Sequence, residues 1–524
     1  MTRTAPAALG VLVLVLAACT PSGGTPPGQQ FAADQTLSFP ISQDLSNLDP
    51  ALLANPGDID ILRNVFSGLY RFDDALREVP DLAVGQPAVS PDGLTYTFHI
   101  RHDAKFSNGD PITAGDVTYS WDRAATRQGD YAWLFGSVAG YADVAAGRAV
   151  HLSGLSKPDD YTVVVTLSKA AGDFIAQVGL WPYWVVDQKV IASAGQDAWF
   201  TTPQTFVGSG PFKLLSWVHG QSMEFAPVPG WYGGKTGSIT KVHVDVQPDP
   251  AAQLALYESG VFSLLGYARQ GLSSDAAKKY TADLVLKKQL TLDPLGVTYW
   301  VGFNLKTGPF SGDAGRDGRR AFSLAIDRAA LADAVCNQKT GCAVASGGLI
   351  SKGLQGYLGD GVDLNAKFDA AGAKALYAAW DPNGSNVKGL TYTYDTSVVN
   401  KLVCDNLAAQ WKQNLGVTVA CAELDRKTYL ADRDGSCAYT LFRQSWSADY
   451  DHPRDWFDHL FAGGANSSGS CYANASFDQL IAAADSGSLA AGIPGYRTAG
   501  QMPSTTRPSL PCCTTFSRTS SSLI

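Results

Sequence analysis

Few residues of this chain have the type and spacing to do chemistry, and the strongest nucleophile candidate is Ser209. It stands between two glycines in Val207-Gly-Ser-Gly-Pro211. A nucleophile elbow needs the spacing Gly-x-Ser-x-Gly, which this segment lacks. We therefore interpret Ser209 as part of a tight crossing of the chain between lobes. A secreted hydrolase remains an alternative without a motif to support it.

A metal site is the second chemical possibility. His452 and His459, with Asp455 and Asp458 between them, fit no established ligand spacing, and we expect them to line a solvated helix face. Residues 313–318 begin like a calcium loop, but glycine and leucine occupy two positions that need oxygen ligands. We expect no catalytic residue, no metal and no cofactor.

The N-terminus carries the pattern of an exported lipoprotein. A charged start at residues 1–3 precedes an apolar run at residues 7–18, which is too short to span a bilayer. The run ends in Leu16-Ala-Ala-Cys19, the pattern at which lipoprotein signal peptides are cut, leaving Cys19 as the lipidated first residue. A Pro/Gly/Ser-rich tether follows up to residue 30. The alternative is an ordinary secretory signal with an incidental cysteine, and either reading places the mature protein outside the cytoplasm.

Nine cysteines in an oxidising compartment should mostly be paired. With Cys19 assigned to the lipid, and Cys512 and Cys513 left over, six remain. The candidate pairs are Cys336 with Cys342, Cys404 with Cys421, and Cys437 with Cys471. Spacing alone leaves this connectivity open. No CxxC or Cys/His cluster supports a metal site instead.

Composition indicates a large folded body. The chain has 524 residues with 45% hydrophobic content, enough for two or three domains with substantial cores. No second stretch is long and apolar enough to cross a membrane. The formal charge of −8 argues against nucleic acid as a partner, since nucleic acid requires a basic face.

The elements that must position any site alternate between strands and helices without a fixed repeat, which predicts a mixed α/β architecture. Alternating apolar residues indicate strands around residues 96–100 and 242–246. The sequence Thr113-Ala-Gly-Asp116 is typical of a capping box that opens a helix. Helical spacing predicts further helices over residues 59–69, 249–259, 319–335, 370–380 and 398–415.

A series of landmarks runs along the chain in unbroken order from about residue 37 to about residue 502. They are Leu48-Asp-Pro50, Asn64 to Tyr70, Asp92 to Phe98, Phe106 to Val117, Tyr119 to Arg123, Val207 to Phe212, Phe303-Asn304 with Pro309-Phe310, Ala325 to Arg328, Trp411 to Val417 and Trp446 to Tyr450. Together they resemble the extracellular solute-binding proteins, family 5, of bacterial peptide, dipeptide and nickel ABC importers, here as a lipoprotein of actinobacterial type.

The resemblance implies a periplasmic-binding-protein-like (type II) two-lobed α/β fold with an extra α/β domain and a ligand cleft between the lobes. A hinge motion would close the lobes around the ligand. The implied divisions are a signal peptide at 1–18, a tether at 19–30, lobe I at 31–75 and 206–290, the extra domain (lobe II) at 76–205, lobe III at 291–487 and a C-terminal segment at 488–524.

The implied role is a monomeric, membrane-tethered receptor that captures a short peptide and delivers it to the ABC permease subunits. The family also binds nickel chelates, glutathione, haem and oligosaccharides, so another small solute remains an alternative. A surface adhesin is a further alternative, and it would need no enclosed cleft.

The resemblance also implies site residues. A buried ligand ammonium needs an anionic partner, and in peptide binders of this family the Asp of the segment matching Trp446 to Tyr450 grips the ligand's amino terminus. That residue is Asp449 here, and a turn-forming Asp is the alternative. Arg443 occupies a place where an arginine can meet a ligand carboxylate, with a structural salt bridge as the alternative.

The remaining expected ligand contacts are apolar walls and backbone. Trp446 and Trp300 are expected to form walls, with a core position as the alternative for both. Ser447, next to Trp446, is also an expected ligand contact. Asp44 and Leu45 are expected to contact the ligand from the first lobe. Gly302 stands where some oligopeptide binders carry an acid, so one contact to the ligand backbone is expected to be absent.

The end of the chain departs from the rest. Residues 503–524 are rich in Ser, Thr, Pro and Arg, and they contain no acid or lysine. We interpret this composition as a reading-frame shift near codon 503, which would remove closing strands from the first lobe. A natural disordered tail is the alternative.

Overall fold

The computed structural model describes residues 34–74, 76–234, 237–268, 270–336, 342–362, 367–464, 468–487, 489–502 and 509–521. The predicted signal peptide, the tether and Cys19 lie outside these ranges. Within them, no helix has both the length and the apolar character needed to cross a membrane.

The first lobe is built around a four-stranded sheet in the order β1-β10-β9-β8. Strand β1 (Thr36–Ile41) runs parallel to β10 (Lys241–Val246), so two distant chain segments meet in one sheet. The other strands are antiparallel: β8 (Phe212–Val218) and β9 (Ser222–Pro227). The helices of this part are η1 (Pro50–Leu52), α1 (Pro56–Leu62), α6 (Pro250–Glu258), α7 (Ser274–Ala282) and η4 (Leu286–Gln289).

The extra domain packs helices against an antiparallel sheet in the order β4-β5-β7-β6, preceded by the small hairpin β2-β3. Helix α2 (Ala114–Arg127) starts as predicted, because the Asp116 carboxylate accepts a hydrogen bond of 2.9 Å from the Thr113 N–H. The remaining elements are β2 (Tyr70–Phe72), β3 (Glu78–Pro80), β4 (Ala88–Val89), β5 (Thr95–His99), η2 (Ala132–Ser137), α3 (Tyr141–Ala145), β6 (Leu155–Asp159), β7 (Thr162–Thr166), α4 (Phe174–Val178), η3 (Trp181–Tyr183) and α5 (Gln188–Ala194).

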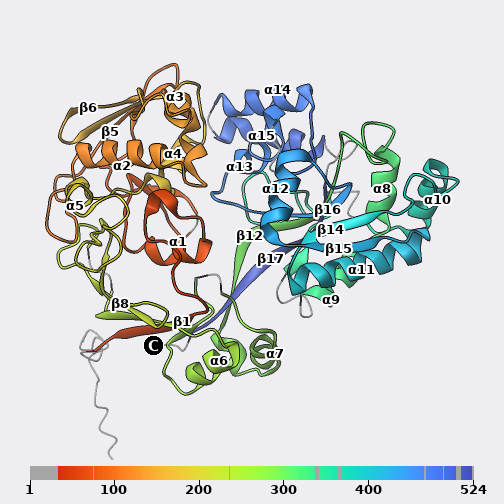
Figure 1. The fold of residues 1–524 in the computed structure, drawn as a ribbon, viewed down its shortest axis with the longest axis horizontal. Coiled ribbons are helices and arrows are strands. Elements are labelled where there is room, and N and C mark those ends of the chain that lie inside the picture. Colours follow the sequence, from red (N-terminus) through yellow and green to blue (C-terminus); the bar gives the residue numbers. More distant parts are fainter. Residues whose placement is uncertain are drawn as a thin grey trace, which may run out of the picture.

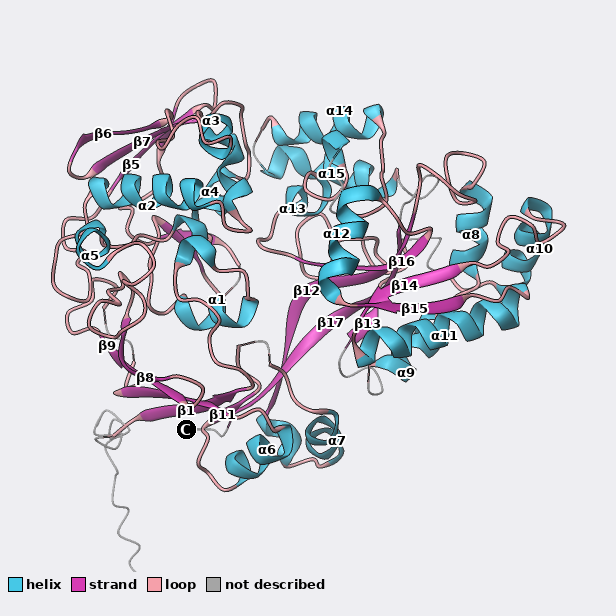
Figure 2. Cartoon of the chain, viewed as in Figure 1, coloured by secondary structure: helices cyan, strands magenta, loops and turns pink. Residues whose placement is uncertain are grey.

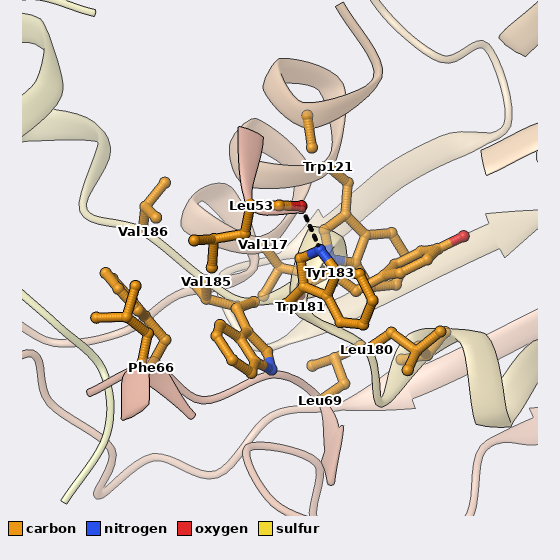
Figure 3. Packing of buried hydrophobic residues seen from close by; sticks show 14 of the residues in the cluster. Leu53, Phe66, Leu69, Val117, Trp121, Leu180, Trp181, Tyr183, Val185 and Val186 are labelled. Carbon is orange, nitrogen blue, oxygen red and sulfur yellow. Dashed lines mark hydrogen bonds between the residues drawn. The ribbon is translucent and has the colours of Figure 1, made fainter. Parts of the chain in front are cut away.

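The first lobe and the extra domain share one hydrophobic core (Figure 3). Trp181 and Trp121 pack within it, and the Trp181 indole N–H donates a 2.9 Å hydrogen bond to the Leu53 carbonyl of the first lobe. A fully buried ion pair between Arg123 and Asp49 joins the same two parts. The first lobe and the extra domain are therefore packed together through one core and a buried ion pair.

The second large lobe contains a seven-stranded sheet, counted over the described residues, in the order β11-β17-β12-β16-β14-β15, with β13 paired to β17. Strands β12 and β17 run side by side from the α6–α7 end of the molecule into this lobe, so they form its connection to the first lobe (Figures 1 and 2). The strands are β11 (Leu264–Leu265), β12 (Leu290–Phe303), β13 (Cys342–Val344), β14 (Thr391–Asp395), β15 (Ala420–Leu424), β16 (Leu441–Ser447) and β17 (Ser509–Ser521).

Helices cover both faces of this sheet, and each face has its own core. Tyr299, Val301 and Phe303 of β12 face one core, which includes α8, α9 and α11. Trp300 faces the other core, which includes α13, α14 and α15. The helices are α8 (Arg316–Leu324), α9 (Arg328–Val335), α10 (Ala370–Trp380), α11 (Val398–Leu415), α12 (Arg426–Ser436), α13 (Pro453–Phe457), η6 (Ala462–Gly464), α14 (Ala475–Asp485) and α15 (Leu489–Gln501).

Two predicted helices have different bounds in the structure. The helix predicted over residues 319–335 is broken into α8 and α9, because Asp327 caps a new helix by accepting hydrogen bonds from the N–H groups of Ala329 and Ala330. The helix predicted over residues 59–69 ends as α1 at Leu62, although the apolar residues beyond it are buried. The helices at 370–380 and 398–415 are confirmed.

The predicted cysteine pairs all lie at disulfide distance. The Cα–Cα separations are 5.4 Å for Cys336–Cys342, 6.0 Å for Cys404–Cys421 and 6.0 Å for Cys437–Cys471.

The C-terminal segment, for which a frame shift is predicted, contributes strand β17. Its backbone pairs with β12 and β13 in lobe III and with β11. The place of a closing strand between the lobes is therefore filled. The frame shift itself concerns the gene and stays a prediction.

Candidate functional site

A cavity of about 430 Å³ lies between the two large lobes, and we call it the first cavity. Its volume falls in the usual range of small-ligand pockets. One wall comes from α1, the β2–β3 hairpin and the loop after β11. The other comes from β12, the loop at 352–354 and the segment after β16. The lining residues are Asp60, Arg63, Phe72, Leu76, Gly266, Tyr267, Ala268, Leu295, Gly296, Lys352, Gly353, Leu354, Ala448, Asp449, Tyr450 and Asp451.

Asp449 lines the first cavity from the lobe III side. The end of β16 positions it: the Ala448 N–H donates 3.0 Å to the Gly296 carbonyl, and the Asp449 N–H donates 3.2 Å to a carboxylate oxygen of Asp455. These two bonds fix the backbone that leads into Asp449. Hydrogen bonds within lobe III therefore help to hold Asp449 at the cavity wall.

The first cavity carries charges of both signs. Asp60, Asp449 and Asp451 are its acids, and Arg63 and Lys352 are its bases. Both bases are exposed, with side-chain exposures of 55% for Arg63 and 67% for Lys352. Sequence reasoning missed these two cations, because surface lysines and arginines carry no pattern that marks a cleft.

Asp455 stabilises the backbone that carries Asp449. It is fully buried, and one of its carboxylate oxygens accepts hydrogen bonds from the Trp446 indole (3.0 Å) and from the Asp449 N–H. Burial and the neighbouring Asp449 carboxylate raise the pKa of Asp455 well above its ordinary range. The prediction that Asp455 lies on a solvated helix face is wrong.

The same correction applies to His452, which is 3% exposed. Burial lowers its pKa to about 4, so the imidazole is neutral, and it caps α13 by accepting from the Arg454 N–H. No group of three metal-ligating side chains is found among the described residues.

Ser209 is buried. Its hydroxyl donates a hydrogen bond to the Val185 carbonyl and accepts one from the Ser67 N–H, which suits a structural crossing of the chain.

Arg443 does not line the first cavity. Its guanidinium lies 3.5 Å from the buried Asp395 carboxylate and 5.4 Å from the centre of the Tyr299 ring. Successive side chains of a strand point to opposite faces. Arg443 therefore faces one core of lobe III, while Trp446, three residues later on β16, faces the other.

The other residues predicted to contact the ligand also interact with other parts of the protein. Trp300 is 1% exposed in a core, and Leu45 is buried in the core of the first lobe. Asp44 accepts hydrogen bonds from the Trp217 indole and the Gly220 N–H. Trp446 is partly buried, with its ring centre 4.7 Å from that of His459, and Ser447 pairs with Val297 at the end of β16. Of the seven predicted ligand contacts, the first cavity is lined by Asp449 alone.

A buried charge cluster joins the extra domain to lobe III. Asp173 of the extra domain is 0% exposed and pairs with Arg454 of α13. Its carboxylate also accepts 2.7 Å from the Tyr450 hydroxyl and 2.8 Å from the Gln177 amide. Burial opposes ionisation of Asp173, but Arg454 and the other partners hold its pKa below the ordinary value.

A cleft between two lobes that is lined by charges of both signs is the arrangement of a solute-capturing protein. The family profile described as "Bacterial extracellular solute-binding proteins, family 5 Middle" matches residues 77–468, well over half of the sequence. The chain belongs to this family.

The comparisons with individual proteins agree. The chain is 27% identical over 461 residues to the dipeptide-binding protein DppE of Bacillus subtilis, covering 86% of this chain and 81% of that one. It is 27% identical over 491 residues to the periplasmic oligopeptide-binding protein OppA of Salmonella typhimurium, covering 92% and 87%.

Solved structures share the fold. The unliganded open form of the murein tripeptide-binding protein MppA matches with a TM-score of 0.78 at 24% identity, covering 94% of this chain and 93% of that one. Clavulanic acid biosynthesis oligopeptide binding protein 2 matches with a TM-score of 0.80 at 20% identity, covering 94% and 92%. The predicted two-lobed, type II binding-protein fold is confirmed.

Proposed function

We propose that this protein is the peptide receptor of an ABC importer and works outside the cytoplasmic membrane. Family membership and the peptide-binding relatives support this role. The observation that carries it is the first cavity, where Asp449 faces a space that also holds Arg63 and Lys352. A zwitterionic ligand finds partners for both ends there, and a peptide is the simplest such solute.

Asp449 is the proposed partner of the ligand's ammonium group, and Arg63 or Lys352 the partner of its carboxylate. Main-chain hydrogen bonds in such a cleft would accept many sequences. Trp446 is proposed to act indirectly, since its indole holds the Asp455 carboxylate that in turn fixes the Asp449 backbone. No catalytic role is assigned to any residue.

The anchoring of the receptor is also a proposal. Cys19 is proposed to carry the lipid that tethers a monomer near its permease, and the three cysteine pairs at disulfide distance are proposed to be disulfides. Metabolic labelling with a fatty-acid analogue tests the first. A Cys19→Ala chain that stays fully membrane-bound would contradict the lipid anchor.

The first experiment on function is mass spectrometry of small molecules released by denaturing the purified mature protein, since tight ligands leave binding proteins slowly. Short peptides are the expected result. Recovery of a sugar or a metal chelate would instead assign the receptor to another ligand class.

Calorimetric titration with trialanine then tests the site. Asp449→Ala should weaken binding at least thirtyfold, equivalent to about 2 kcal/mol for a lost charge partner. Asp405→Ala, which removes an exposed acid on α11, is the matched control and should leave affinity unchanged within error. Equal affinities for the two variants would refute the role of Asp449.

A further inference from the structure

A second cavity, of about 330 Å³, lies between the extra domain and lobe III. The extra domain contributes residues from η2, α4 and the loop between β7 and α4, and lobe III contributes residues from Tyr450 to the end of α13 and just beyond. The lining residues are Trp133, Leu134, Gly136, Ser137, Lys169, Gln177, Tyr450, Arg454, Asp455, Asp458 and His459.

Three buried polar atoms around this cavity have no hydrogen-bond partner in the described part of the chain. They are the Ser137 hydroxyl, the Gln177 amide oxygen and the second carboxylate oxygen of Asp455. Their residues are 5%, 5% and 0% exposed. Buried polar atoms are normally paired, so three orphans at one cavity indicate an occupant. The Gln177 amide oxygen accepts hydrogen bonds, and the Asp455 oxygen accepts them once its carboxyl, whose pKa is raised, has lost its proton, so an occupant that donates suits both.

The charge around the second cavity favours a cation. Arg454 is already surrounded by carboxylates, since it pairs with Asp173, Asp458 and Asp485. Lys169 is exposed, and burial lowers the pKa of the His459 imidazole, which keeps it neutral. No salt bridge in the described residues gives Asp455 a cationic partner.

The two cavities adjoin. Tyr450 lines both of them, and the Asp455 carboxylate that borders the second cavity accepts the backbone N–H of Asp449, which borders the first. A ligand whose ammonium lies at Asp449 would thus have a neighbouring side chain next to the second cavity. With a volume of about 330 Å³, the second cavity is large enough for an extended side chain.

We infer that the second cavity is a subsite for a cationic side chain, of the lysine or arginine class, at the first or second residue of the bound peptide. Asp455 is its counter-ion, and Gln177 and Ser137 are neutral acceptors. This inference rests on the proposed peptide-binding function and adds a selectivity to it. Because burial and Asp449 raise the pKa of Asp455, arrival of a cation should also expel a proton from this carboxyl.

The test uses trialanine and its variants with lysine or norleucine at each position, titrated calorimetrically into the mature protein. Norleucine keeps the four side-chain carbons of lysine and lacks its ammonium group. The peptide with lysine at position one or two should bind at least tenfold tighter than the peptide with norleucine there. At position three the lysine and norleucine peptides should bind with equal affinity. Asp455→Asn keeps an acceptor for Trp446 and should bring the lysine-to-norleucine ratio to within about twofold. Asp405→Asn, which neutralises an exposed acid on α11 that lines neither cavity, should leave the ratio intact.

The outcomes separate the two proposals. If trialanine binds but lysine and norleucine are equivalent, or an acidic side chain is preferred, the subsite is refuted and the peptide function stands. If no peptide binds the wild-type protein, the proposed function itself fails. Should the Asp455→Asn chain not fold, titration of the wild type in buffers of different ionisation enthalpy decides. Proton release with the lysine peptide alone supports the subsite, and equal release with both peptides refutes it.

Discussion

The buried contact between Arg454 and Asp173 gives a prediction whose size follows from the structure. Arg454 has 8% side-chain exposure and pairs with Asp173 at 0%, Asp485 at 13% and Asp458 at 35%. Arg454→Met keeps much of the side chain's length and removes all of its charge. The buried Asp173 and the nearly buried Asp485 carboxylates then lose the cation with which they form salt bridges.

The expected destabilisation is about 3–5 kcal/mol, the usual cost of leaving a buried charge without its partner. Removing the other partner as well should restore part of this loss. Asp173→Asn is nearly isosteric and can still accept from Tyr450, so the Asp173→Asn, Arg454→Met double variant should be more stable than additivity predicts. We expect a coupling energy of at least about 2 kcal/mol.

Urea unfolding of the four proteins of this cycle measures the coupling. Arg77→Met is the matched control, because Arg77 pairs with Asp73 at 77% side-chain exposure. It should cost less than about 1 kcal/mol. A coupling energy below about 0.5 kcal/mol would refute the reasoning, since the contact would then not be part of the folded ground state.

Three further predictions test the scaffold. Burial lowers the pKa of His452 from 6.5 to about 4, so its contribution to the free energy of unfolding is present above pH 6.5 and falls by roughly 3 kcal/mol as the pH drops to 4. The variant His452→Asn can still cap α13, and its free energy of unfolding should depend less on pH over this range. Gly208→Ala would place a Cβ 2.2 Å from a backbone oxygen and should cost at least about 2 kcal/mol by thermal unfolding, whereas Gly85→Ala, with open space around it, should be tolerated. Replacing both Cys404 and Cys421 by Ala removes a disulfide between residues 17 apart in the sequence and should cost about 3 kcal/mol of stability. Equal stability of the variant and the wild-type protein under oxidising conditions would count against that disulfide.

Much of the fold was predictable because the family landmarks are structural. Asp49 of the first landmark forms the buried ion pair with Arg123 of another, and Ser209 between its glycines holds two segments together. Local signals also sufficed where capping and periodicity agreed, as in α2 and α11. They failed between α8 and α9, where an apolar run continues across a capping Asp.

The site was less predictable, because a cleft is made by chain segments that sequence spacing does not relate. Arg443 and Trp446 are neighbours in the sequence but face different cores, since strand alternation separates them. Arg63 and Lys352 are distant in the sequence but line one cavity. Asp455 was missed as a buried group because its helix is short and carries polar residues on several sides.

The segment from Asp449 to Asp455 links ligand contact to lobe closure. Asp449 lines the first cavity, and Tyr450, the next residue, lines both cavities and donates to Asp173 of the extra domain. Arg454 pairs with the same Asp173. A ligand changes a conformational equilibrium only by contacting one state better than the other. Because the Asp449 carboxylate, proposed to hold the ligand ammonium, and the contact to the extra domain share one short segment, a peptide bound at Asp449 would stabilise the backbone that also joins lobe III to the extra domain. Loss of Arg454 should therefore reduce peptide affinity as well as stability, by lowering the fraction of molecules in the binding-competent state.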